Sequence, residues 1–233
     1  MRNKKKANNL YVGFSYQLQY KKILGIGASS KVAVDAVVLG ENERFLYLNE
    51  IDHANTWING GNIPLNLASS YKSHERAGVK TPDENLIHDS TYDLRLLYPA
   101  ISLGNVKNFN MHGCKINGKR VPDISGANFY IEDGVVLCLS KTRDAKVAAR
   151  FGNKKCCVKI LDVEKLKSII DSKIGVSGVL RDCDYTDSFQ RNHFLKSIKD
   201  SWQSETRIFW AAKNKIEVML PPGIAEFIEE YKY

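Results

Sequence analysis

Short strand-like runs separated by turn residues fill much of the chain, and they constrain its fold more than any other feature. Residues 44–49 alternate between two faces, whereas residues 134–140 and 206–210 are nearly continuous apolar runs, and both patterns indicate β-strands. Helical patterns gather early and late in the chain. This distribution predicts a single α+β domain with mainly antiparallel pairing. The expected strands are residues 44–49, 63–67, 128–131, 134–140, 155–161, 206–210 and 217–220.

Helices are predicted where a capping residue precedes a period of about 3.6 residues. Ser29 or Ser30 is a suitable N-cap for the first helix, which Gly40 ends. Asp52 is expected to cap a short helix that ends at Gly60. The first of these helices covers residues 28–39 and lies in an N-terminal helical extension over residues 1–43. Further helices are expected at residues 163–172, 190–201 and 224–231.

Two segments in the middle of the chain have no helical period. Residues 70–93 are polar and aperiodic, and a long segment of that kind inside a compact domain is typical of a binding loop, a lid or a disordered segment. Residues 105–123 predict a hairpin, because Asn117 and Gly118 form the dipeptide that favours a tight turn between strands.

Composition limits the class of protein. The chain has 233 residues and is 43% hydrophobic, so it can bury a core. Its apolar runs are too short to span a bilayer, no secretory signal is evident, and no membrane partner is expected. Its five cysteines are an odd number without metal-ligand spacing, and its five histidines lie far apart. We therefore expect a cytoplasmic protein with reduced thiols and without a metal site.

The chain carries a net charge of +8. Excess positive charge attracts nucleic acid or other acidic surfaces. The basic residues are scattered, and the dense run at residues 4–6 is interpreted as a solvated tail.

An acidic residue near the C-terminus has a distinctive setting. A helix-length stretch ends at Trp202, the strand-like run 206–210 follows, and Glu205 lies at the joint. A carboxylate at the start of a strand can be held rigidly while its head faces a cleft. The alternative interpretation is that Glu205 and Arg207 form a surface ion pair on an edge strand.

Four segments together resemble the ADP-ribosyltransferase-like superfamily, whose members use NAD⁺ as a donor of ADP-ribose. The first is residues 45–50, followed by a short helix and Gly60-Gly61. The second is residues 135–140, followed by a helix, and the third is the strand-to-helix step at residues 155–166. The fourth is the segment 194–207, with the order Trp-x-x-Glu-x-Arg. The resemblance implies a split antiparallel β-sandwich core flanked by helices.

The resemblance also implies catalytic residues. Glu205 would stabilise the positive charge that develops on the ribose as the nicotinamide bond breaks, as in glycoside cleavage. Gln203 would orient the acceptor, since the Gln-x-Glu spacing is similar to that of transferases that modify asparagine, glutamine or a nucleobase.

Residues that bind NAD⁺ are implied in the same way. The family's opening strand supplies a His, Arg or Tyr, and here Tyr47 is the best match and Asn49 the second. Ser140 would match the family's structural serine. Pyrophosphate needs cations, which Arg143, Lys141 or a residue of the 70–93 segment could supply.

These implications lead to one hypothesis and its rivals. The hypothesis is an NAD⁺-dependent ADP-ribosyltransferase, a toxin or antiphage effector that modifies nucleic acid, with RNA favoured over DNA; a toxin would have an antitoxin partner. A transferase that modifies a protein side chain is one rival. A ribonuclease that does not use NAD⁺ is another, and a catalytically inactive RNA-binding module of the same fold is the third.

Overall fold

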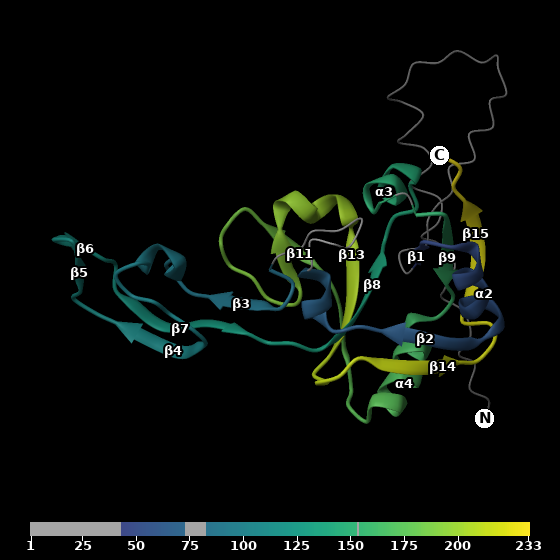
Figure 1. The fold of residues 1–233 in the computed structure, drawn as a ribbon, viewed down its shortest axis with the longest axis horizontal. Coiled ribbons are helices and arrows are strands. Elements are labelled where there is room, and N and C mark those ends of the chain that lie inside the picture. Colours follow the sequence, from purple (N-terminus) through teal and green to yellow (C-terminus); the bar gives the residue numbers. More distant parts are fainter. Residues whose placement is uncertain (1–42, 73–82, 153) are drawn as a thin grey trace, which may run out of the picture. The chain divides into compact units, whose positions relative to one another are not determined.

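The computed structural model describes residues 43–72, 83–152 and 154–233 (Figure 1). All of these residues belong to one compact unit, Gly40–Tyr233. The helix predicted over residues 28–39 and nearly all of the expected extension lie outside the described residues. No helix among the described residues is long and apolar enough to cross a lipid bilayer.

A six-stranded sheet in the order β10-β13-β8-β1-β9-β15 forms the centre of the fold, and every neighbouring pair is antiparallel. The α+β class and the mainly antiparallel pairing expected from the sequence are therefore confirmed. The strands are β1 Arg44–Leu48, β8 Val135–Ser140, β9 Cys156–Ile160, β10 Val179–Asp182, β13 Glu205–Trp210 and β15 Ala225–Glu230.

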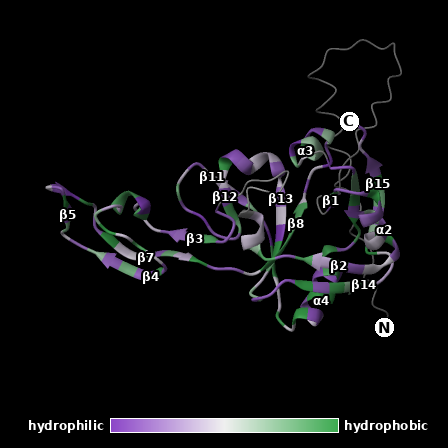
Figure 2. Cartoon of the chain, in the orientation of Figure 1, coloured by the Kyte–Doolittle hydropathy of each residue, from purple (hydrophilic) through white to green (hydrophobic). Residues whose placement is uncertain are grey.

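One face of this sheet packs against the main hydrophobic core. Side chains alternate along a strand, so Ile208 and Trp210 of β13 enter this core while Glu205 and Arg207 lie on the other face. The apolar strand β8 contributes to the core in the same alternating way (Figure 2). The opposite side of the core is formed by α2 Ile51–Asn59, β2 Gly61–Leu65, α4 Val163–Ile174 and β14 Ile216–Leu220.

Helix α2 ends where the sequence predicts, but it begins earlier. Its N-cap is Glu50, with Asp52 in the first turn, so the prediction that Asp52 caps the helix is wrong. Gly60 closes the helix with φ 83°, and a Cβ there would lie 2.8 Å from the carbonyl oxygen of Leu220. Only glycine combines that backbone conformation with so close an approach to β14.

The other helices are capped by aspartates. In α4 the Asp162 side chain accepts a hydrogen bond from the Lys165 amide at 2.9 Å, and Gly175 ends the helix in the left-handed conformation. Helix α3, Ala145–Arg150, begins after Asp144, whose side chain accepts from the Lys146 amide at 2.7 Å. The helices expected after Ser140 and over residues 163–172 are thus confirmed.

The middle of the chain forms a long hairpin with its own small core. The turn at Asn117 and Gly118, with φ 50° and 75°, is the one that the sequence predicts. The prediction that residues 70–93 form a loop is wrong for residues 86–89, because these residues pair with the second half of the hairpin. The strands are β3 Leu86–Asp89, β4 Val106–Met111, β5 Lys115–Ile116, β6 Lys119–Arg120 and β7 Ile124–Ile131.

The helix predicted over residues 190–201 is wrong. Arg191 pairs with His88 of β3, and β12 Leu195–Ser197 lies parallel to β11 Asp184–Thr186. A 3₁₀ helix, Ile198–Gln203, then leads to β13. Pairing with distant segments outweighs the local helical pattern here.

The C-terminal helix predicted over residues 224–231 is also wrong, because the segment forms strand β15. Strand β9 pairs with β1 on one edge, and β15 covers its other edge. Covering a strand edge satisfies a row of backbone groups that would otherwise stay unpaired. The ladder contains a register shift between Phe227 and Glu229.

Candidate functional site

The central sheet is split between β1 and β8. The two strands share one ladder pair, Phe45 opposite Ser140, whereas β9 pairs with β1 along its whole length. At its other end β8 pairs with a different segment, since the Val136 amide donates to the carbonyl of Asn66 at 3.1 Å and Leu67 bridges to Val135. The two strands therefore diverge from the Phe45–Ser140 pair.

A cavity of about 410 Å³ lies at this split. Its lining includes the consecutive residues 45–49 and 136–140. Successive side chains point to opposite faces of a sheet, so a cavity that touches every residue of both runs lies between the strand edges. Most of the lining from β1, β2 and β8 is apolar. Charged side chains enter from β12 and β13 and from the segments that precede β3 and β9.

Three neighbouring strands bring a row of side chains to this cavity. Phe45 of β1 lies opposite Ser140 of β8, which lies opposite Glu205 of β13. The next residues on the same face are Cys138 and Arg207, which also face each other across the β8–β13 ladder. The residues predicted from two separate sequence segments, Ser140 and Glu205, are therefore adjacent.

Glu205 is a buried carboxylate with two cationic partners. Its Oε1 accepts from Arg207 Nε at 2.9 Å, and its Oε2 accepts from Lys196 Nζ at 2.7 Å. Burial alone would raise the pKa of Glu205, but the positive charges of Arg207 and Lys196 outweigh it and hold the pKa well below its usual range. Glu205 is thus a fixed anion at neutral pH. The ion pair that the sequence suggested exists, but it is buried on an interior strand rather than exposed on an edge.

A fourth charge completes this cluster. Arg207 also contacts Glu84, and Lys196 Nζ lies 4.0 Å from Glu84 Oε2. Two carboxylates and two cations, all with side chains less than a tenth exposed, therefore compensate one another. We call Glu84, Lys196, Glu205 and Arg207 the ion cluster. Buried charges are tolerated only when they are paired in this way.

Lys196 also fixes the orientation of Gln203. Lys196 Nζ donates to Gln203 Oε1 at 2.7 Å, which assigns the other amide atom, Nε2, as a hydrogen-bond donor. Nε2 is buried and has no hydrogen-bond partner among the described residues, and Gln203 lines the cavity. An unpaired buried donor is costly, so its place on the cavity wall suits a ligand with an acceptor atom.

Ser140 ties β8 to the turn before Glu205. Its hydroxyl donates to the carbonyl of Gln203 at 2.9 Å, and the amide of Lys141 donates to the carbonyl of Ser204 at 2.7 Å. Ser204 has φ 43°, so the chain bends sharply there before β13 begins. These two hydrogen bonds connect the end of β8 to the turn that precedes Glu205.

Tyr47 and Asn49 line the cavity, but Arg143 is exposed and does not. The Tyr47 ring packs against Phe151, and burial raises its pKa to about 12. Asn49 lies near the surface and accepts a hydrogen bond from Lys154 Nζ at 2.6 Å. Lys154 also lines the cavity, so a positive charge borders the cavity beside Asn49.

Replacing Tyr47 by Phe should lower the free energy of unfolding by about 1–3 kcal/mol, since two backbone groups lose their partner. The hydroxyl donates to the carbonyl of Thr142 at 2.7 Å and accepts from the amide of Asp144 at 2.9 Å, which holds the start of α3. Chemical denaturation measures the change. Tyr98→Phe, at a ring that is 72% exposed, is the control, and equal losses in both variants would contradict this role.

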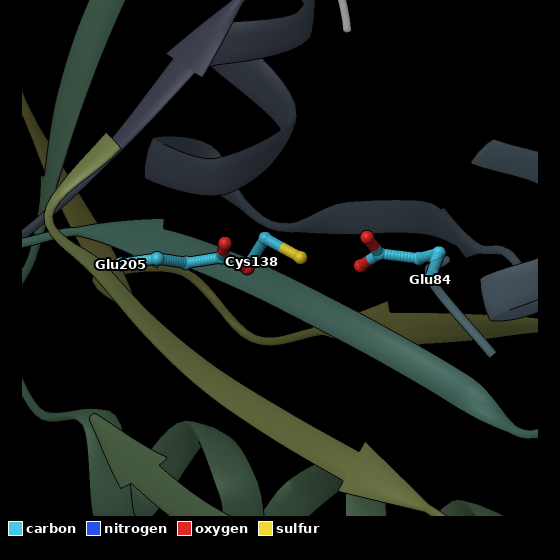
Figure 3. A group of neighbouring side chains, drawn as sticks. All are labelled: Glu84, Cys138 and Glu205. Carbon is cyan, nitrogen blue, oxygen red and sulfur yellow. The ribbon is translucent and has the colours of Figure 1, made fainter. Parts of the chain in front are cut away.

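Glu84, Cys138 and Glu205 bring three ligand-type atoms within 4.8 Å of one another. Figure 3 shows Cys138 between the two carboxylates. Both carboxylates already form ion pairs with Lys196 and Arg207 within the ion cluster. Burial raises the pKa of the Cys138 thiol well above its usual value, so the thiol stays protonated. These charges fit an ion-paired site better than a divalent metal site.

Sequence reasoning missed two members of the ion cluster. Lys196 lies in the segment 190–201, for which the sequence predicts a helix, and Glu84 lies in the segment 70–93, for which it predicts a loop. Neither residue lies beside a sequence motif that would indicate a functional role. Tyr185 was also missed, and its hydroxyl accepts a hydrogen bond from the Glu205 amide at 2.9 Å.

Comparisons with known proteins leave the family open. No protein-family model, curated protein or solved structure matches this chain.

Acid should weaken the fold through Glu205. Its folded pKa lies below the unfolded value of about 4.5, so its contribution to stability is complete above that pH and is lost as the pH falls toward about 2. We expect Glu205→Gln to have a shallower decline of the unfolding free energy below pH 5 than wild type. Glu217→Gln, at an exposed carboxylate on β14, is the control and should keep the wild-type decline. Parallel declines in wild type and Glu205→Gln would contradict the assignment.

Proposed function

We propose that the protein is an NAD⁺-dependent ADP-ribosyltransferase with a split antiparallel β-sandwich. We further propose that it transfers ADP-ribose to nucleic acid, with RNA favoured over DNA. The observation that carries the proposal is the Glu205 carboxylate, ionised at neutral pH, on the wall of the cavity at the split. Its neighbour across the ladder is Ser140, the serine that the sequence resemblance implies.

The cavity suits the nicotinamide half of NAD⁺. A volume of about 410 Å³ falls in the range of small-molecule sites, about 300–1,000 Å³. Leu46 and Leu137 supply apolar surface for a planar ring, and Tyr47 adds an aromatic side chain. Lys154 beside Asn49 offers a positive charge to a phosphate.

The chemistry needs a fixed negative charge and little else from the protein. Breaking the bond between nicotinamide and ribose builds positive charge on the ribose, and the electron pair of that bond leaves with the nicotinamide nitrogen. A carboxylate held in place before the reaction stabilises that charge without reorganisation. Glu205 meets this requirement, because Arg207 and Lys196 fix both of its oxygens.

A nucleic acid acceptor is supported by the net charge of +8, because excess positive charge attracts phosphate backbones, and by the Gln-x-Glu spacing of Gln203 and Glu205. The toxin or antiphage role, with an antitoxin as partner, rests on the resemblance of the sequence segments described above.

The experiment that tests this function uses NAD⁺ labelled in its adenylate half, together with RNA, DNA and cell protein. Release of nicotinamide and transfer of label to RNA is the expected result. Label on protein would favour the rival transferase. The absence of nicotinamide release with every acceptor would overturn the proposal and leave a ribonuclease or an inactive binding module.

A further inference from the structure

A second cavity of about 390 Å³ borders the ion cluster from another side. Glu84, Lys196 and Arg207 line both cavities, so these side chains contribute to a common wall. The remaining lining of the second cavity is mostly polar. Most of it comes from the segment before β13, including Lys199 and Asp200, and Asp83 comes from the segment before β3.

The charges at the second cavity suit a nucleotide. Lys199 is exposed and forms no ion pair among the described residues, so its ammonium can pair with a phosphate. Arg191 adds a guanidinium that is partly buried and contacts Asp83 at 3.4 Å. The volume is also sufficient for one base with its sugar, within the range of about 300–1,000 Å³ for small-molecule sites.

The transfer reaction needs a proton acceptor, and Glu205 is poorly suited to be one. Both of its oxygens are held by cations, and its pKa is well below the usual range. A general base works best when its pKa is closer to the operating pH.

Asp200 lines the second cavity, and its side chain makes no hydrogen bond or ion pair in the described part of the chain. Burial raises the pKa of Asp200; Lys196 opposes the rise, Glu84 and Glu205 add to it, and Arg191 opposes it. Lys199, Asp83 and Arg207 are the other charged groups of this lining.

We propose that the second cavity is the acceptor site, a proposal that rests on the function proposed above. A nucleotide of the acceptor strand enters it with its phosphate against Lys199 and Arg191. As the bond between nicotinamide and the ribose carbon breaks, a nitrogen or hydroxyl oxygen of the acceptor forms a bond to that carbon. The acceptor's proton passes to the Asp200 carboxylate, and neutral nicotinamide leaves.

The first test separates the acceptor step from the cleavage of NAD⁺. Asp200→Asn should reduce transfer to an RNA oligonucleotide about 100-fold or more, the range of general-base catalysis. Nicotinamide release without acceptor is measured in parallel, and the ratio of transfer to release should fall in the variant, because only transfer needs a proton acceptor. Asp187→Asn, at an exposed carboxylate that lines neither cavity, is the matched control. Equal transfer by the two variants would overturn the role of Asp200.

The pH profile gives a readout that a purely structural residue would not change. In wild type, transfer should fall as the pH drops through the raised pKa of Asp200, because the base becomes protonated. Asp200→Asn should lose this acid limb and keep only a low, flat rate. An acid limb that persists in the variant would assign the proton to another group.

The second test does not need NAD⁺. Binding of a short fluorescent RNA oligonucleotide is measured by anisotropy for Lys199→Glu and for its control Lys213→Glu, which is exposed and outside both cavities. We expect at least a threefold loss of affinity for Lys199→Glu alone, since one phosphate contact becomes repulsive.

The outcomes of the second test separate the site from the function. Equal binding by the two variants, or no binding by wild type, would overturn the nucleotide site. If Lys199→Glu alone weakens binding while wild type releases no nicotinamide, the site stands and the transferase function fails. Label that reaches only protein would overturn the nucleotide as the acceptor.

Discussion

Replacing Glu205 by Gln should reduce the rate of nicotinamide release from NAD⁺ at least about 100-fold, the usual cost of removing a group that stabilises charge in the transition state. Glutamine has nearly the same shape as glutamate but no negative charge. The variant therefore keeps the packing of the site and loses the attraction for the positive ribose. The measurement is the rate of release under saturating NAD⁺, at a temperature where circular dichroism shows the variant to be folded.

Glu84→Gln is the matched control for this variant. It removes the same charge from the same ion cluster, and both carboxylates are buried beside Lys196 and Arg207. We expect a comparable loss of stability and a much smaller loss of activity. Equal losses of activity in both variants would show that Glu205 acts only through the ion cluster.

Replacing Arg207 by Met should lower the free energy of unfolding by about 3–5 kcal/mol, the cost of leaving a buried charge without its partner. Arg207 is 1% exposed and contacts both Glu205 and Glu84. Without it, two buried carboxylates share Lys196 alone. Urea denaturation at pH 7 measures the loss by linear extrapolation.

Arg181 provides the control for this substitution, because it lies directly opposite Arg207 on the neighbouring strand β10. Its side chain is 60% exposed and lies 4.0 Å from Asp184, so Arg181→Met should cost less than about 1 kcal/mol. The double variant Arg207→Met with Glu84→Gln restores the charge compensation and should be more stable than the sum of the two single losses predicts. Strict additivity would contradict a coupled ion cluster.

The sequence was informative where a local pattern decides the structure. The alternation of residues 44–49 and the apolar run 206–210 placed β1 and β13 correctly to within a residue or two. Local sequence also places Glu205 at the start of one strand and Ser140 at the end of another, because residues close in sequence determine where each strand begins and ends. Their adjacency follows from the pairing of β8 with β13.

The sequence was uninformative where partners are distant. Lys196 points inward because its ammonium group donates hydrogen bonds to Glu205 and Gln203. The residues next to Lys196 in the sequence give no indication of these partners. Residues 224–231 have a local pattern that suits a helix, but they pair with the uncovered edge of β9. Burial of the Glu205–Arg207 pair depends on β10 and β8 lying on either side of β13.

Strand β13 has no solvent-facing residue, since all six of its side chains are buried. Its inner face supplies apolar side chains to the core, and its other face carries Glu205 and Arg207. A slip of one residue would place charges in the apolar core and expose Ile208 to the ion cluster, which makes such a slip very unfavourable. The register of the whole strand therefore fixes the position of the Glu205 carboxylate, and this register is determined by the apolar residues that fold the sheet.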